Sequence, residues 1–197
     1  MSRVGVKKRK EDSGILKYKG EKKDGKPEGK GKLVSSSGKK YKGTFKDGLF
    51  HGQGTLSFQN GNIYEGRFKK GKKHGEGMFA WNHGERYEGT FLKDKRHGTG
   101  VFTWRSGGRY EGTSFFIFHR LIDLGYSYKG EFKLDKRTGK GVLSWPDGEK
   151  YDGFFLDDRL EGTGVYYYAN GDRYEGLFQN GMKHGRGIYH FSNNDRY

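Results

Sequence analysis

The stretch from Tyr64 to Gly77, YEGRFKKGKKHGEG, decides the fold of this chain. Tyr64, Gly66 and Phe68 stand at alternate positions, so a β-strand would place them on one face and the intervening charged residues on the other. A turn signal follows, and the alternation resumes from Gly77 through Phe79. The stretch therefore predicts a β-hairpin.

The same pattern returns along the chain with a period of 23 residues, interrupted once by an interval of 18 residues. A lone hairpin buries too little area to be stable, whereas stacked hairpins cover one another. We therefore predict an all-β fold, an elongated, twisted, single-layer antiparallel sheet of about sixteen strands. The tyrosines that open the repeats are Tyr18, Tyr41, Tyr64, Tyr87, Tyr110, Tyr128, Tyr151, Tyr174 and Tyr197.

Glycine recurs on the same face as the aromatic residues. A glycine follows two residues after each repeat tyrosine except Tyr197, and 36 of the 197 residues are glycine. A glycine leaves bare backbone, over which a large ring from the same face can lie. We expect a core made of a thin layer of aromatic rings.

Composition limits the class of protein. Hydrophobic residues make up only 30% of the chain, but 16% of it is aromatic, and disordered chains are poor in aromatic residues. The chain has no cysteine, so disulfides and cysteine zinc sites are excluded. No apolar run approaches the length of a signal peptide or a membrane span, so we expect a soluble, cytoplasmic protein.

The positive charge is concentrated near the start. The formal net charge is +15, and residues 1–50 contribute 16 Lys and Arg against 6 Asp and Glu. We divide the chain into a basic flexible tail (1–17), four repeats (18–109), a degenerate repeat (110–127), and three repeats followed by the start of another (128–197). An open strand edge near Tyr197 could pair with a partner or with a second copy of the chain.

Groups for catalysis or cofactor binding are not apparent. Histidines recur at one place in the repeat, but equivalent positions in successive hairpins lie about 10 Å apart and cannot share a metal ion. The Gly-x-Gly pairs lack the remaining residues of phosphate-binding loops, and no nucleophile elbow occurs. We expect no enzyme activity, no cofactor and no metal. The recurring histidines are His51, His74, His97 and His184.

The pattern Tyr-Glu-Gly-x-Phe-x-x-Gly-x-x-His-Gly-x-Gly, found at 64–77 and 174–187, resembles the MORN (membrane occupation and recognition nexus) repeat. The resemblance covers seven full repeats between residues 18 and 196. It implies several settings: radial-spoke heads of cilia, junctional membrane tethers, the cytoskeletal cortex of parasites, and regions of plant lipid kinases and a lysine methyltransferase.

We expect a scaffold for protein assembly, resembling the radial-spoke head members of that family in a ciliary or flagellar axoneme, with axonemal or cytoskeletal partners. The apolar segment 110–127 is either a degenerate repeat or a bent joint with a docking patch. Nucleic acid is not expected, because the aromatic residues serve packing. The candidate partner-binding residues are Phe79, Trp81, Phe102, Trp104, Phe116, Phe118, Trp145, Tyr166 and Tyr168.

Two alternatives stay open. A peripheral membrane adaptor would bind anionic phospholipids through the basic N-terminal half, beginning with the cluster Lys7, Lys8, Arg9 and Lys10. A regulatory fragment of a longer enzyme would carry its chemistry in another domain.

Overall fold

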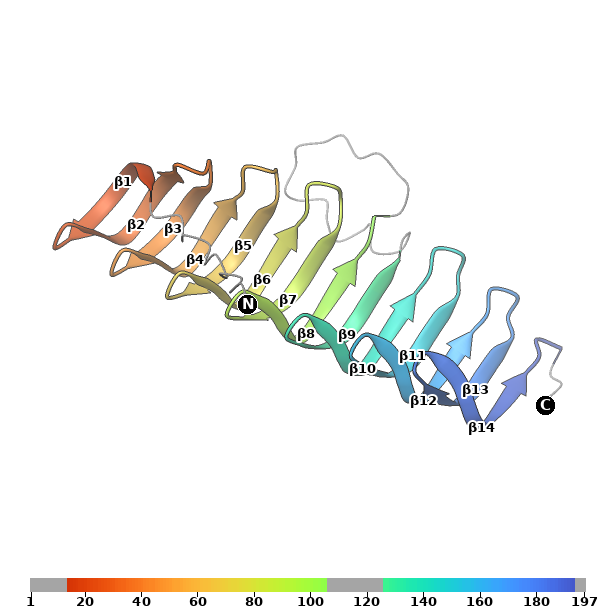
Figure 1. The fold of residues 1–197 in the computed structure, drawn as a ribbon. Coiled ribbons are helices and arrows are strands. Elements are labelled where there is room, and N and C mark those ends of the chain that lie inside the picture. The colour runs from red at the N-terminus through yellow and green to blue at the C-terminus, as the bar shows by residue number, and fades with distance from the viewer. Residues whose placement is uncertain (1–13, 106–125, 194–197) are drawn as a thin grey trace, which may run out of the picture.

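The computed structural model describes residues 14–105 and 126–193, which form one antiparallel sheet of fourteen strands (Figure 1). The strands lie in chain order, each paired with the one before and the one after it. They are β1 (Ile15–Lys23), β2 (Lys26–Ser35), β3 (Lys40–Lys46), β4 (Leu49–Ser57), β5 (Ile63–Lys69), β6 (Lys72–Ala80), β7 (Arg86–Leu92), β8 (Lys95–Thr103), β9 (Ser127–Lys133), β10 (Lys136–Ser144), β11 (Lys150–Leu156), β12 (Arg159–Tyr167), β13 (Arg173–Gln179) and β14 (Met182–His190). The predicted all-β, single-layer, antiparallel sheet is confirmed.

Tight turns join the two strands of each hairpin. Asp94, Asp135 and Asp158 have φ values of 75°, 79° and 73°, and the residue before each also has positive φ. Two successive residues with positive φ match the backbone twist of the flanking strands, and Asn, Asp and Gly adopt that conformation most easily. In the other hairpins an Asp-Gly, Lys-Gly or Asn-Gly pair occupies the same place.

Paired glycines lie at the middle of each hairpin, beneath a tyrosine ring. Gly66 is directly opposite Gly77, and a Cβ atom on Gly77 would come within 2.7 Å of the Cε2 atom of Tyr64. The Tyr64 hydroxyl donates a hydrogen bond of 2.9 Å to the carbonyl of Arg67. The ring therefore lies flat along its own strand, in space that only glycine leaves open. This arrangement confirms the predicted role of glycine.

The core is a continuous layer of rings along one face of the sheet. The ring of Tyr64 meets Phe68 of its own hairpin and Phe91 of the next edge-on, with centroids 5.0 and 5.1 Å apart. Equivalent contacts link the other hairpins, and Tyr64 and Tyr87 are fully buried. Each hairpin thus completes the burial of its neighbour, which explains how a single layer can have a core.

The sheet continues without a break from β8 to β9. Gly98, Gly100 and Phe102 pair with Phe132, Gly130 and Tyr128, the register seen between other hairpins. The expectation of about sixteen strands counted a hairpin for the repeat at Tyr110, but the described residues form fourteen strands and β8 pairs directly with β9. The predicted degenerate repeat 110–127 lies mostly outside the described residues, which resume at Tyr126.

Candidate functional site

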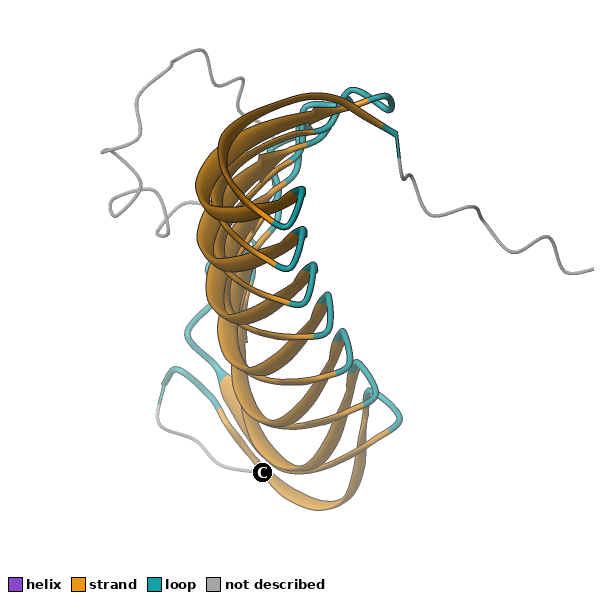
Figure 2. Cartoon of the chain, turned by 90° about the vertical axis from the view of Figure 1, so that its left-hand side faces the viewer, coloured by secondary structure: helices purple, strands orange, loops and turns teal. Residues whose placement is uncertain are grey.

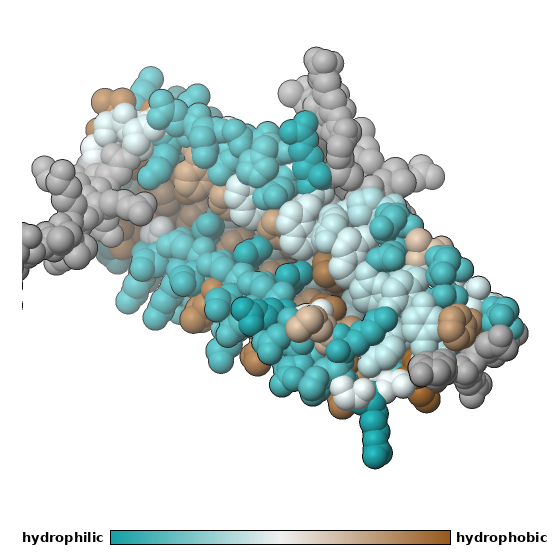
Figure 3. Space-filling view, turned by 45° about the vertical axis from the view of Figure 1, so that its right-hand side comes forward, coloured by the Kyte–Doolittle hydropathy of each residue, from teal (hydrophilic) through white to brown (hydrophobic). Residues whose placement is uncertain are grey.

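The sheet is curved, and its aromatic face is concave. Seen from its end, every hairpin bends in the same direction (Figure 2). Figure 3 shows that face hollowed between hydrophilic margins, with apolar and aromatic side chains along the hollow. We call it the aromatic groove. The partly buried rings that line it are Phe58, Trp81, Trp104, Tyr126, Trp145, Tyr166, Tyr168 and Tyr189.

These rings form an unbroken series of contacts along the groove. The centroids of Trp81 and Phe102 are 5.4 Å apart, and those of Phe102 and Trp104 are 4.5 Å apart. The series continues through Tyr126 at 5.2 Å from Trp104 and Trp145 at 5.7 Å from Tyr126. The contacts fix the indole rings in place, so the groove presents a preformed aromatic surface.

The structure brings most of the predicted partner-binding residues into this groove. Trp81, Trp104 and Trp145 lie just after alternate strands, and their rings are only partly buried. Tyr166 and Tyr168 extend the same surface toward β14.

The other predicted binding residues are placed differently. Phe79 and Phe102 are buried in the core, with 8% and 6% of their surface exposed, which leaves little area for a partner. Phe116, Phe118 and the basic cluster Lys7, Lys8, Arg9 and Lys10 lie outside the described residues.

Among the cations that lie over rings, four occupy equivalent places in the aromatic groove, and sequence reasoning missed them. Lys73 Nζ is 4.4 Å from the ring centroid of Phe79, and Arg96 Cζ is 5.0 Å from that of Phe102. Arg137 and Lys183 make similar contacts farther along. A signal was present, because all four stand nine residues after a repeat tyrosine. A cation over an aromatic face is attracted to its quadrupole, more strongly where water is excluded.

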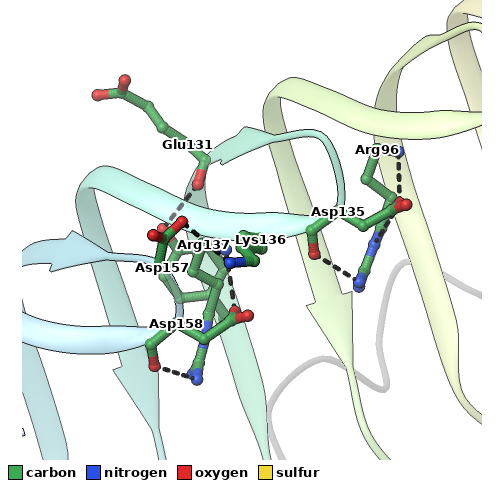
Figure 4. Close-up of polar contacts among 8 residues, drawn as sticks. Arg96, Glu131, Asp135, Lys136, Arg137, Asp157 and Asp158 are labelled. Atoms are coloured by element: carbon green, nitrogen blue, oxygen red, sulfur yellow. Dashed lines mark hydrogen bonds and ion pairs between the residues drawn. The ribbon is translucent and has the colours of Figure 1, made fainter.

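Aspartates from the following hairpin hold the two arginines in position (Figure 4). Arg96 donates from its backbone N to Asp135 Oδ1 at 2.8 Å, and its guanidinium donates to the Asp135 carbonyl at 2.8 Å. Arg137 and Asp158 repeat both contacts at 3.0 and 2.8 Å. Each aspartate occupies the second position of a tight turn, so turn geometry and arginine orientation depend on each other.

Lys73 occupies the equivalent position, but its side chain makes no ion pair within the described residues. The Asp94 carboxylate accepts a hydrogen bond from the Lys73 backbone N at 2.9 Å. Burial among the rings lowers the pKa of Lys73, and the nearby Asp94 carboxylate partly opposes that effect. The ammonium group is therefore held in a partly desolvated position, where an incoming carboxylate would be attracted strongly.

A hollow of about 270 Å³ lies at the centre of the groove. Its walls are indole rings and guanidinium groups, with carboxylates at the margin. This arrangement offers flat apolar surface, cation faces and fixed hydrogen-bond acceptors, which is suited to holding a side chain. The lining residues are Trp81, Glu85, Arg96, Phe102, Trp104, Phe132, Asp135, Arg137 and Asp158.

Two further searches cover the described residues, one for clusters of metal-ligating side chains and one for membrane-spanning helices. Within 14–105 and 126–193, no three His, Asp or Glu side chains gather where they could hold an ion. Over the same ranges there is no helix of sufficient length and apolarity to cross a bilayer.

The family model of the MORN repeat matches seven segments: 18–40, 41–63, 64–86, 87–109, 128–150, 151–173 and 174–196. The chain belongs to the MORN repeat family. A comparison of this MORN repeat protein with curated proteins found no match. Among solved structures, it is similar to the TCP domain of SAS-4 (dCPAP) from Drosophila melanogaster, solved in complex with a proline-rich motif of Ana2 (dSTIL). The two are 12% identical, with 86% of this chain and 82% of that one covered and a TM-score of 0.49.

Proposed function

We propose that this MORN repeat protein is a non-catalytic scaffold that holds a segment of a partner protein in the aromatic groove. The observation that carries the proposal is the row of partly exposed Trp and Tyr rings, with Arg96 and Arg137 fixed among them. Trp, Tyr and Arg are the residues most enriched at the energetic centres of protein interfaces. A preformed groove also avoids the entropic cost of ordering side chains on binding.

The groove dimensions indicate the kind of segment that fits. Trp81, Trp104 and Trp145 follow β6, β8 and β10, so the first and last are four strand spacings apart, about 19 Å. A helix of about thirteen residues has that length. Its apolar side chains would lie against the indole rings, and an acidic side chain would face Lys73.

We further propose that the scaffold serves in a ciliary or flagellar axoneme, as in radial-spoke heads, or in a related cytoskeletal structure. Two features support this setting. The matched repeats fill most of the chain, and radial-spoke heads are among the settings that resemblance to MORN proteins implies. An assembly role also agrees with a surface built for contact along its length.

Affinity capture from ciliated cells with mass spectrometry tests this proposal. The bait is the full chain, beside a groove variant, Trp81→Ser with Trp104→Ser, and an outer-surface control, Ile63→Ser, whose side chain is exposed. We expect axonemal proteins with the unaltered chain and the control, and their loss with the groove variant. Circular dichroism and urea unfolding check that each variant is folded. An unchanged set of partners with a folded groove variant would contradict the groove as the interface.

A further inference from the structure

The face opposite the groove, which we call the outer face, carries a cluster of lysines on its first three strands. Each of them is exposed, and none forms an ion pair with a carboxylate of the described residues. These lysines therefore contribute neither to the core nor to an ion pair within the described residues, so the fold does not account for their presence. The cluster consists of Lys17, Lys19, Lys30, Lys32, Lys40 and Lys42.

Strand pairing aligns part of the cluster into a row that crosses the sheet. Lys19 is opposite Lys32, and Lys32 is opposite Lys42. The row continues through Thr55 and ends at Glu65 on β5. Four strand spacings separate Lys19 from Glu65, about 19 Å. Three positive charges, one hydroxyl and one negative charge thus follow one another along a line.

This row lies along a hollow of about 670 Å³ in the outer face. Its floor includes the paired glycines Gly20 and Gly31, then Gly43 and Gly54. Side-chain positions at these glycines point to the tyrosine rings of the concave face, so on the outer face these four residues present only backbone. Lysine stems and polar side chains stand around this floor, so a narrow chain can lie between them.

The far end of the hollow has the opposite charge. Glu65 lines it, and its Oε2 atom is enclosed without a hydrogen-bond partner in the described part of the chain. A carboxylate oxygen left without a donor is costly. A positively charged group or donor on a ligand would be attracted to the charge of this carboxylate, while acidic groups of the ligand meet the lysines.

We propose that this hollow binds an extended acidic peptide segment of a partner protein. Its acidic side chains would face Lys19, Lys32 and Lys42, and a hydrogen-bond donor two or three residues farther on would face Glu65. An extended chain of about six residues spans the row. The site is on the opposite face from the aromatic groove, so the two could be occupied together.

Charge arrangement favours a peptide over other anionic partners. A lipid headgroup layer or a nucleic-acid backbone presents negative charge along its whole length, which Glu65 would repel. Among the described residues, those that line the hollow include no apolar side chain that could enter a bilayer. A peptide can change the sign of its charge from one residue to the next, as this row requires.

Fluorescence anisotropy with the full chain tests the proposal. The probe is a labelled peptide of five glutamates followed by glycine, threonine and lysine. A control peptide has glutamines in place of the glutamates. We expect binding of the acidic probe only. The variant with Lys19→Gln, Lys32→Gln and Lys42→Gln should bind it about tenfold more weakly, since three exposed charge pairs are lost.

A matched variant separates the site from net charge. Lys46→Gln, Lys69→Gln and Lys70→Gln remove the same charge from exposed positions that do not line the hollow. We expect this variant to bind the probe as the unaltered chain does. Equal weakening in both variants would overturn the proposal, because it would show attraction to overall charge alone.

Two further measurements test the orientation of the bound peptide and the class of ligand. Glu65→Gln should reduce the preference for the probe that ends in lysine over the same probe ending in acetyl-lysine. Phosphatidylserine vesicles and single-stranded DNA are titrated under the same conditions. Binding of either through the same three lysines, with no binding of the peptide, would assign the hollow to a membrane or to nucleic acid instead.

Discussion

The two faces of this sheet are built from the same strands, but the residues at equivalent positions of successive repeats vary much more on the outer face than on the aromatic face. On the aromatic face, Tyr64, Tyr87 and Tyr128 repeat one contact pattern, each over a pair of glycines and between two phenylalanines. On the outer face, equivalent positions carry Lys42, then Glu65. The aromatic face must pack against itself, so each repeat constrains the next. The outer face has no such constraint, and its charges can differ from one hairpin to another.

Alkaline pH should have the largest effect on the aromatic face. Burial raises the pKa of Tyr41 and of Tyr151 to about 12, and it also raises the pKa of Tyr64. The folded state therefore favours the neutral phenol. This contribution to stability is complete below the unfolded pKa near 10 and is lost as pH rises through the folded pKa.

Each pKa unit corresponds to about 1.4 kcal/mol, so Tyr41 and Tyr151 together account for about 5 kcal/mol between pH 10 and 12. Phenolate absorbance measures the ionisation of the tyrosines, and circular dichroism measures the loss of the sheet. Both are recorded on the same sample as the pH rises. We expect a group of tyrosines to ionise only as the sheet unfolds. Half-ionisation of all the tyrosines near pH 10 with the sheet intact would contradict the description of the aromatic face.

A substitution by alanine should lower the free energy of unfolding far more on the aromatic face than on the outer face. Gly77→Ala places a Cβ against the ring of Tyr64, and we expect the free energy of unfolding to fall by about 3 kcal/mol. Glu76→Ala alters the adjacent exposed residue and should change it by less than about 0.5 kcal/mol. Urea unfolding followed by tryptophan fluorescence compares them. Equal effects would mean that the tyrosine ring can move aside.

The smallest expected effect concerns neighbouring aspartates in one turn. Asp158 accepts hydrogen bonds from Arg137 at the groove margin, whereas Asp157 forms an exposed pair with Lys136 at 3.3 Å. Asp158→Asn should lower the free energy of unfolding by about 1 kcal/mol, and Asp157→Asn should leave it nearly unchanged. The same urea measurement applies. A larger loss from Asp157→Asn would reverse the assignment of roles.

Period and alternation were enough to predict the strands and the aromatic face, because both depend on contacts between adjacent repeats. The period also marks Lys73, nine residues after Tyr64, but it does not predict that Lys73 lies opposite Phe68. A regular ladder would pair Phe68 with Gly75, but an irregularity after Gly66 brings Lys73 opposite Phe68. The cation is placed over the rings by that local departure from the ladder, which alternation does not encode.

The lysine row was hidden for a different reason. Lys19 and Lys42 each follow a repeat tyrosine and are one period of 23 residues apart, but Lys32 stands between them, 13 residues after Lys19 and 10 before Lys42. Only the pairing of three strands brings them into line. Tyr126 was also missed, because its place in the repeat, two residues before the tyrosine, is occupied by Glu85 and Glu149 in other hairpins.

Because β8 pairs directly with β9, the spacing of the rings along the groove depends only on the number of strands between them. Trp81 and Trp104 are 23 residues apart, and Trp104 and Trp145 are 41 residues apart, yet each pair is separated by two strands. Distance along the groove is therefore counted in strands and not in residues. A segment inserted in the connection between two hairpins therefore does not change the distance between the rings on either side of it. The spacing of rings that a partner meets stays the same.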